Sequence, residues 1–238
     1  MTAHDTLIEI NSRLGRELDS IDLKTASWIY NPLDYAFSAV REYLELFTPS
    51  PGAVLFLGMN PGPWGMAQTG IPFGAVSAVR DWMRISPIQG RPKHEHPRVP
   101  VRGFECGRDE VSGKRFWNLM SARYPRAQDF FAEHFVINYC PLMFLDTAGR
   151  NLTPDKLPVA ERKILFRLCD TALTQMIEII QPARLIGIGN FAEKRLKENF
   201  STQYPIHKLL HPSPANPAAN RNWEGQARAI LEDQGIWK

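Results

Sequence analysis

Short apolar runs alternate with amphipathic segments along this chain. Four runs are apolar at nearly every position, which is typical of strands buried on both faces of a sheet. They cover residues 53–57, 135–139, 184–188 and 206–210. No hairpin turn joins one run to the next, so we expect parallel strands, which need long crossover connections.

The segments between these runs predict helices, because their apolar residues recur at spacings of three and four. The predicted helices cover residues 34–47, 75–83, 109–123, 158–180 and 223–233, the last capped by Asn220 or Asn222. Strands that alternate with helices predict a parallel sheet covered on both faces, a three-layer α/β/α sandwich. The sequence has no repeat and no long linker, so we expect a single domain over residues 1–238.

Composition narrows the class of protein. Hydrophobic residues make up 44% of the 238 positions and charged residues 22%, which is ordinary for a globular protein. The opening residues, MTAHDTLIEINSR, lack the apolar region of a signal peptide, and no apolar stretch approaches the roughly 18 residues of a membrane span. We therefore expect no membrane partner and an intracellular location, cytoplasmic in a bacterium or nuclear in a eukaryote.

The cysteines and the net charge limit the cofactors and partners. Cys106, Cys140 and Cys169 are widely separated, a spacing that fits neither a disulfide framework nor a CxxC metal site. An iron–sulfur cluster usually needs four thiolates. We expect no metal and no cofactor. The net charge of +3 permits a polyanionic partner without requiring one.

A long uncharged loop follows the first strand. Its residues from Gly58 to Gly74 read GMNPGPWGMAQTGIPFG and include five glycines and three prolines. Most connections need only about two to six residues, so this length is typical of a binding loop. The loop lacks the Gly-Lys-Ser/Thr ending of a phosphate-binding loop. Phe73 or Trp64 would stack on a flat neutral ligand, unless Trp64 packs beneath the loop.

Polar residues also follow the other three strands, where ligands bind in parallel sheets. Asn138 ends the second strand, and its amide either presents a donor beside an acceptor or forms a turn. Residues 187–192, GIGNFA, have the G-x-G-x-x-A skeleton of a dinucleotide-binding turn, but no acidic residue follows about 20 positions later. A helix start at this point suits any phosphate. His211 opens the stiff loop HPSPANPAAN, as either a structural or a functional residue.

Two of these segments together resemble a known family. GMNPGPWGMAQTGIPFG and HPSPANPAANRNWE, in this order and each after a strand, are similar to the two motifs of single-strand-selective monofunctional uracil-DNA glycosylases, within the uracil-DNA glycosylase superfamily. The GIGNFA and INYCPL segments fit the same family. The resemblance implies a uracil-DNA glycosylase-like fold with a central four-stranded parallel sheet. It also implies a hydrolase that flips out uracil and removes it in base excision repair, acting as a monomer on single- and double-stranded DNA.

The resemblance implies catalytic roles for Asn60 and His211. Asn60 would position the hydrolytic water, and His211 would hydrogen-bond the departing base. An amide cannot accept a proton, so Asn60 would orient the water without acting as a general base. The site motifs contain no lysine that could form a Schiff base, so we expect base removal without strand cleavage.

The resemblance also implies binding roles. Phe73 would stack on the flipped base, Asn138 would read its edge, and Met59 and Gly62 would line the pocket. The residues expected to bind DNA lie in the GIGNFA turn and the Pro-rich loop, and they are Gly189, Asn190, Pro212, Ser213, Pro214, Ala215 and Asn216.

Two positions bear on substrate choice. Some members of the superfamily have a tyrosine at position 62 that blocks the C5 side of uracil, whereas Gly62 would leave that side open. We therefore expect 5-hydroxymethyluracil and related damaged bases to be accepted. The Pro-rich loop that contains Ala215 would enter the gap left by the flipped base. Animal members have a basic residue at this position, so we expect this protein to open duplexes less well.

Three alternatives stay open. The first is a DNA-binding protein without catalysis. The second is a dinucleotide-binding enzyme that uses the turn from Gly187 to Ala192. The third is a metal hydrolase that uses His94 and His96, although the sequence suggests no third ligand.

Overall fold

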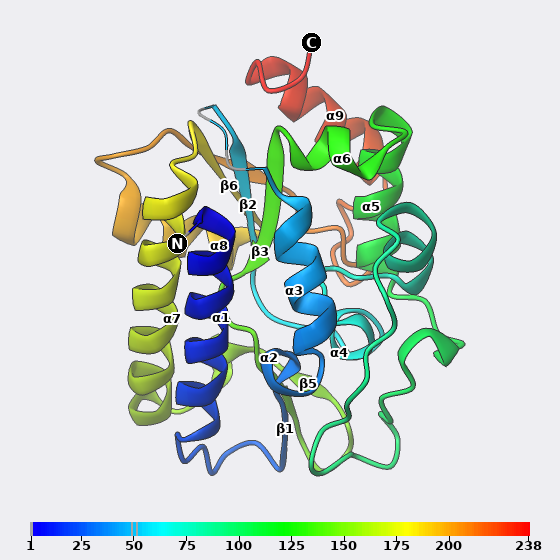
Figure 1. Ribbon diagram of the computed structural model, residues 1–238, viewed down its shortest axis with the longest axis vertical. Helices are drawn as coiled ribbons and strands as arrows, with labels where there is room; N and C mark the ends of the chain where they lie inside the picture. Colours follow the sequence, from blue (N-terminus) through cyan, green and yellow to red (C-terminus); the bar gives the residue numbers. More distant parts are fainter. Residues whose placement is uncertain (1, 49, 51) are drawn as a thin grey trace.

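A four-stranded parallel sheet forms the centre of the protein (Figure 1). The computed structural model describes residues 2–48, 50 and 52–238. The central strands are β2 (Val54–Gly58), β3 (His134–Asn138), β6 (Arg184–Ile188) and β7 (Ile206–Leu209). They lie in the order β3-β2-β6-β7, and every neighbouring pair is parallel. Their bounds match the four apolar runs to within one residue, so the predicted sheet is confirmed.

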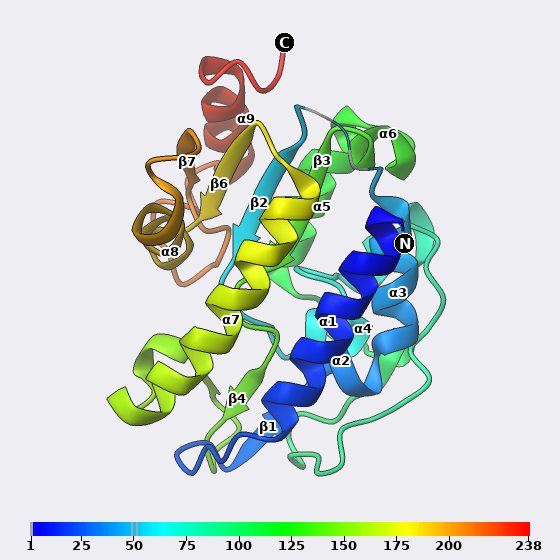
Figure 2. The same cartoon turned by 60° about the vertical axis from the view of Figure 1, so that its left-hand side comes forward.

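Helices cover both faces of this sheet. The longer ones are α1 (Ala3–Asp19), α3 (Phe37–Leu46), α5 (Val111–Arg123), α7 (Val159–Ile180), α8 (Asn190–Phe200) and α9 (Trp223–Asp233). The shorter ones are α2 (Pro32–Tyr35), α4 (Met66–Thr69) and α6 (Ala127–Phe131), with 3₁₀ turns at Gly103–Glu105 and Pro154–Lys156. In Figure 2, α7 crosses in front of the sheet and α5 lies behind it.

Aromatic contacts fix which helix packs on which face. Phe56 of β2 meets Phe116 of α5, with ring centroids 5.9 Å apart. Phe135 of β3 pairs with Leu55 and therefore points to the opposite face, because side chains alternate along a strand. On that face Phe135 stacks on Tyr43 of α3, with centroids 5.2 Å apart. The predicted α/β/α sandwich is thus confirmed.

The sheet topology places the site. From β2 the chain passes to β3 on one side and later to β6 on the other, so the strand order reverses at β2. Ligands of open α/β sheets bind beyond the carboxyl ends of the strands at such a point. The loop that begins at Gly58 leaves the sheet there.

Most of the predicted helices are confirmed. The segments 109–123, 158–180 and 223–233 form α5, α7 and α9, with bounds that differ by at most two residues. Asn222, and not Asn220, caps α9, because its side chain accepts a hydrogen bond from the backbone N–H of Gly225. The segment 34–47 is divided into α2 and α3, which meet at Ala36.

The helix predicted over residues 75–83 is confirmed in position but not in regular α-helical geometry. Residues 76–77 are α-helical, Ala78–Trp82 continue as a π-helical turn, and Arg84 follows with a left-handed φ of 58°. Tertiary contacts hold the turn, since the Trp82 indole donates a hydrogen bond to the Tyr124 carbonyl at 3.0 Å and packs against Trp117. These contacts lie where the helix departs from α-helical geometry, so packing changes the form of the helix without abolishing it.

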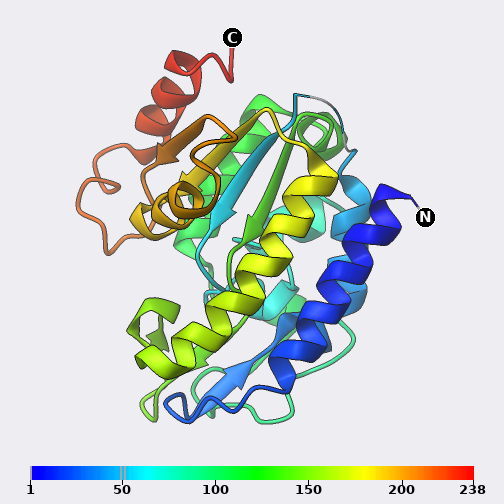
Figure 3. The same ribbon diagram turned by 90° about the vertical axis from the view of Figure 1, so that its left-hand side faces the viewer.

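A second, antiparallel sheet was not predicted. It contains β1 (Trp28–Tyr30), β4 (Met143–Leu145) and β5 (Asn151–Leu152), in the order β1-β4-β5. Figure 3 shows that it lies beyond the carboxyl ends of the central strands. These strands have only two or three residues, too short for a clear apolar pattern.

Helix α1 was also not predicted, although the sequence carries a signal for it. Thr2 and Asp5 form a capping box, and buried Leu7, Leu14 and Leu18 recur at helical spacing. Figure 1 shows α1 alongside α7. Over the ranges that the structure describes, every helix is too short or too polar to cross a membrane.

The buried His134 predicts acid-sensitive stability. Its Nε2 lies 2.9 Å from the Tyr124 hydroxyl and 3.4 Å from the Trp237 indole nitrogen, and burial lowers its pKa to about 4. In the unfolded chain this histidine has its ordinary pKa of about 6.5, so it binds a proton as the pH falls below that value. In the folded protein it binds the proton only near pH 4, so acidification between these values favours the unfolded chain. We expect the free energy of unfolding to fall by roughly 3 kcal/mol from this group as the pH drops through that window.

Urea denaturation of the wild type and of His134→Gln at pH 7, 6 and 5 measures this effect. The variant should be less stable at pH 7 but should lose less stability on acidification. Equal pH slopes in the two proteins would contradict the assignment.

Candidate active site

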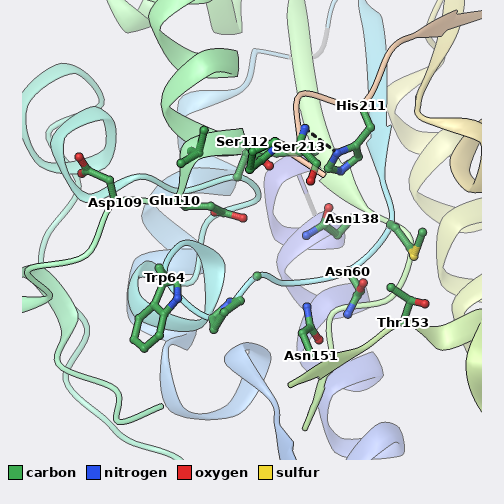
Figure 4. Close-up of a pocket in the computed structure, with 16 residues that line it drawn as sticks. Asn60, Trp64, Asp109, Glu110, Ser112, Asn138, Asn151, Thr153, His211 and Ser213 are labelled. Atoms are coloured by element: carbon green, nitrogen blue, oxygen red, sulfur yellow. Dashed lines mark hydrogen bonds between the residues drawn. The ribbon is translucent and has the colours of Figure 1, made fainter. Parts of the chain in front are cut away.

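A cavity of about 490 Å³ opens at the carboxyl ends of the central strands (Figure 4). Its wall contains eight of the residues that the sequence analysis singled out for the site. They are Met59, Asn60, Gly62, Phe73, Asn138, His211, Ser213 and Pro214. These residues come from the loops after β2, β3 and β7, so the strand ends bring distant segments of the chain together.

Asn138 presents an unused hydrogen-bond acceptor to the cavity. It is the last residue of β3 and pairs with Gly58, whose missing Cβ leaves room for the amide. Its Nδ2 points to the Met66 sulfur at 3.2 Å. Its Oδ1 is buried and has no hydrogen-bond partner among the described residues. Such an atom favours a ligand that brings an N–H to it, because an unpaired buried acceptor is costly.

Phe73 is held in place as one wall of the cavity. Its ring stacks on Phe116 with centroids 5.2 Å apart and planes 23° apart. Its backbone is left-handed, with φ of 55°, which is a strained conformation for an aromatic residue. The Trp117 indole anchors the preceding Pro72 carbonyl at 3.2 Å, and Gly113 lies against the Phe73 carbonyl. Surrounding contacts therefore impose the strain that aims the ring.

Trp64 lies in the cavity wall, at the rim, and is half-buried. The Arg108 guanidinium stacks over its ring at 4.4 Å from the centroid. The sequence left open whether Trp64 packs beneath the loop or faces a ligand. The structure shows both features, because Trp64 packs against a buried cluster and also lines the cavity.

His211 is a neutral donor with a fixed tautomer. The backbone N–H of Ser213 donates a hydrogen bond to His211 Nδ1 at 3.1 Å, as the dashed line in Figure 4 shows. A nitrogen that accepts carries no proton, so the proton of the neutral ring lies on Nε2. Burial lowers the His211 pKa to about 4, which keeps the ring neutral near pH 7. Gly189 leaves room for the imidazole, because a Cβ there would lie 3.1 Å from the His211 Cβ.

Asn60 is oriented by the segment that follows β3. Its Nδ2 donates a hydrogen bond to the Leu142 carbonyl at 3.4 Å. Because this bond engages the amide nitrogen, the Oδ1 of Asn60 is the atom that can hold a water molecule. On the residue's other side, Asn151 of β5 donates to the Pro61 carbonyl at 3.2 Å and steadies the loop.

The glycines of the GIGNFA turn are explained by packing. A Cβ at Gly187 would overlap the backbone of Glu193, so the glycine lets α8 approach β6. Gly189 has φ of 88°, and its N–H donates to the Leu209 carbonyl at 2.8 Å. Five of the predicted DNA-binding residues lie outside the cavity wall, and they are Gly189, Asn190, Pro212, Ala215 and Asn216.

The space beside Gly62 is not open, which corrects the sequence-based expectation. The side chain of Glu110 fills it, since a Cβ at Gly62 or at Gly65 would overlap the Glu110 carboxyl. The carboxyl is buried, and burial raises its pKa to about 7. Sequence reasoning missed Glu110 because the residue lies on a separate loop, before α5. It also missed Asn151 and Thr153, which line the same cavity from the second sheet and the loop after it.

Of the two histidines considered as metal ligands, His94 is exposed and His96 is used elsewhere. His96 is buried, its Nδ1 accepts from the Arg98 N–H at 3.0 Å, and its Nε2 lies 3.3 Å from the Thr147 carbonyl. In the described part of the chain, no group of three His, Cys, Asp or Glu side chains is arranged to hold a metal ion.

Comparisons with known proteins find similar sequences and a similar fold. The model of the uracil DNA glycosylase superfamily matches residues 45–233. The single-strand selective monofunctional uracil-DNA glycosylase of Rattus norvegicus is 44% identical over 233 residues, covering 96% of this chain and 84% of the relative. The Bos taurus protein of that name is 42% identical, covering 94% and 84%. The crystal structure of Pedobacter heparinus SMUG2 has the same fold, with a TM-score of 0.69 over 99% of this chain and 98% of that one, at 18% identity.

The tautomer of His211 can be measured directly. We expect ¹⁵N spectra of labelled protein to show this ring neutral with the proton on Nε2 from pH 8 down to about pH 5, because its pKa is near 4. A His211→Asn variant assigns the signal. Protonation with a midpoint near 6.5, or a proton on Nδ1, would contradict the geometry.

Proposed function

The chain belongs to the single-strand selective monofunctional uracil-DNA glycosylase family of the uracil DNA glycosylase superfamily, and we propose how its cavity performs that reaction. The enzyme is a hydrolase that cleaves the N-glycosidic bond of uracil in DNA, as the first step of base excision repair. One observation carries the assignment of the site. A stacking ring, an amide with a free acceptor and a neutral imidazole donor converge on one cavity.

The amide of Asn138 is suited to reading uracil. Uracil presents a donor, N3–H, beside an acceptor, O4. The free Oδ1 of Asn138 would accept from N3–H, and its Nδ2 would exchange the weak contact with the Met66 sulfur for a bond to O4. Cytosine carries an acceptor at N3 and a donor at C4, so it would leave both amide atoms mismatched. Phe73 offers its face to the ring of the bound base.

His211 is suited to stabilising the departing base. Cleavage of the glycosidic bond leaves negative charge on uracil, part of it on O2. The Nε2–H of His211 would donate to O2, at no cost for rearrangement, because the Ser213 N–H already fixes the ring. Removing one such preorganised donor typically costs about 10²–10³ in rate.

Asn60 would hold the water that attacks the sugar. Its Oδ1 accepts from a water proton but cannot remove that proton, so the water attacks late, after the bond to the base has largely broken. None of the described side chains that line the cavity is a lysine. A covalent sugar intermediate of the Schiff-base kind would therefore lack a nucleophile in the cavity, in agreement with base removal alone.

The Pro-rich loop after β7 is suited to opening DNA. The Arg115 guanidinium donates to the Pro212 carbonyl at 3.0 Å, and the Asn220 amide donates to the Pro214 carbonyl at 2.8 Å. A braced loop loses little conformational entropy when it enters a base stack. Pro214 and Ala215 are exposed at its tip. We propose that this tip occupies the space left by the flipped base, at a cost of a few kcal/mol for unstacking.

The start of α8 is suited to a DNA phosphate. Within the described part of the chain, no side chain caps this helix, which leaves the N–H groups of Asn190 and Phe191 for an anion. The N–H of Gly189 is already engaged by β7. All the residues assigned here come from one chain, and we propose that the protein acts on single- and double-stranded DNA as an intracellular monomer.

The catalytic assignment is tested with Asn60→Ala and His211→Ala. On a uracil-containing oligonucleotide in EDTA, with alkali to reveal abasic sites, we expect rates lower by at least about 10²-fold for each variant, because each loses a preorganised contact. Binding to the same oligonucleotide should change little. Asn199→Ala, an exposed asparagine on α8, is the matched control and should act like the wild type.

A non-catalytic DNA-binding protein would release no base in the wild type. Wild-type release combined with unaltered rates in both variants would leave the family assignment intact and refute the roles of Asn60 and His211.

The role of the Pro-rich loop in opening DNA is tested at Ala215. A methyl group fills the vacated stack poorly, so we expect the wild type to remove uracil faster from single strands than from a U·A duplex. Ala215→Arg should raise the duplex rate several-fold relative to the single-strand rate. Ala218→Arg adds the same charge at another exposed position of the loop and should not change that ratio. An equal effect of both variants would assign the gain to charge alone.

A further inference from the structure

Glu110 is a half-buried residue whose carboxyl has no role in the proposed reaction. It directly precedes α5, where an acidic side chain often caps a helix, but it makes no capping hydrogen bond. Its side chain turns into the cavity instead (Figure 4). Its Oε2 is buried and has no hydrogen-bond partner among the residues that the structure describes. The neighbouring Asp109 differs, since it is exposed and pairs with Lys114 at 2.8 Å.

Two glycines of the long loop are shaped around this carboxyl. A Cβ at Gly62 or Gly65 would overlap the Glu110 oxygens. The fold therefore reserves space for an acidic group without supplying it with a donor. A buried carboxyl is costly unless it is paired, so a donor is expected to come from the ligand.

The orientation of Asn138 places Glu110 relative to the base. The Asn138 Nδ2 faces Met66, which directly follows Gly65, and Gly65 lies against the Glu110 carboxyl. The Oδ1 side lies toward Phe73. The centroid of the Phe73 ring is 5.8 Å from that of the His211 ring. A base with N3–H on Oδ1 and O4 on Nδ2 then turns O2 toward His211. Its C5, the ring atom next to C4 on the other side, faces Glu110.

The hydrogen-bond donors of the base must pair with the buried acceptors of the cavity. Among the described residues that line the cavity, two buried acceptors have no partner, Asn138 Oδ1 and Glu110 Oε2. The uracil ring has one N–H donor left once N1 is bonded to the sugar, and Asn138 takes it. A hydrogen at C5 leaves room for solvent to meet the carboxyl. A methyl at C5 displaces that solvent and leaves the carboxyl unpaired, whereas a hydroxyl on the C5 substituent pairs with it.

We propose that Glu110 is the specificity-determining residue at the C5 edge of the base, where its carboxyl hydrogen-bonds a hydroxyl on the C5 substituent. This inference rests on the proposed function. The site thereby accepts 5-hydroxymethyluracil and rejects thymine. Discrimination comes from the pairing of one carboxyl and not from an empty space at Gly62. Burial raises the pKa of Glu110 to about 7, and a hydroxyl suits both forms, since it can donate to the carboxylate and accept from the acid.

The test compares three bases in otherwise identical single-stranded oligonucleotides, uracil, 5-hydroxymethyluracil and thymine, with kcat/KM as the readout. We expect Glu110→Leu to lower the ratio of 5-hydroxymethyluracil to uracil by roughly 10- to 100-fold, because the hydroxyl loses its buried partner. The same variant should raise the ratio of thymine to uracil, since no carboxyl is left unpaired. Glu110→Gln keeps hydrogen-bonding atoms of the same shape and should retain most of the 5-hydroxymethyluracil ratio.

Glu105→Leu is the matched control, an exposed glutamate in the same loop, and should leave both ratios unchanged. Thermal melting of each variant reports on folding. An equal loss of kcat/KM for all three bases in Glu110→Leu would show a structural role and overturn the proposal. Unchanged kcat/KM ratios in this variant would also overturn it. Absence of uracil release by the wild type would instead refute the proposed function.

Discussion

The hydrogen bond from the Ser213 N–H to His211 Nδ1 is the constraint on which the site depends. It places the proton of the ring on Nε2, which makes His211 a donor toward the cavity. Burial lowers the pKa of the ring to about 4, so that donor carries no charge. The bond in turn requires a fixed backbone after β7, and Pro212 and Pro214 on either side of Ser213 supply it.

Burial also limits the charge in the resting cavity. Asn60 and Asn138 are amides, His211 is neutral, and burial raises the pKa of Glu110 to about 7. A fixed cation in the cavity would pay a large desolvation penalty before any base entered. Oriented dipoles avoid this penalty and act only as negative charge develops on the departing base. The chemistry thus relies on the direction of a few N–H bonds and not on a net charge.

The sequence predicts the frame of this site better than its details. The four apolar runs and their parallel order are confirmed, because burial on both faces leaves a clear pattern. The helix over 75–83 forms with a π-helical turn that its apolar spacing does not show, because contacts around Trp82 set the turn. The small antiparallel sheet was not predicted, because strands of two or three residues leave no periodic signal. Glu110 and Asn151 were missed for a related reason. Each reaches the cavity from a segment distant in sequence, and a one-dimensional pattern does not show which segments meet.

The glycines of the long loop after β2 illustrate the same limit. In the sequence alone, these glycines indicate a backbone that a ligand can approach closely. In the structure, Gly58 makes room for Asn138 and Phe73, and Gly62 and Gly65 make room for Glu110. Each of these three glycines therefore makes room for a side chain, and the side chains of Asn138 and Glu110 come from outside the loop. It follows that the loop alone does not set the shape of the pocket, and that a change in a facing residue alters the pocket as much as a change in the loop itself.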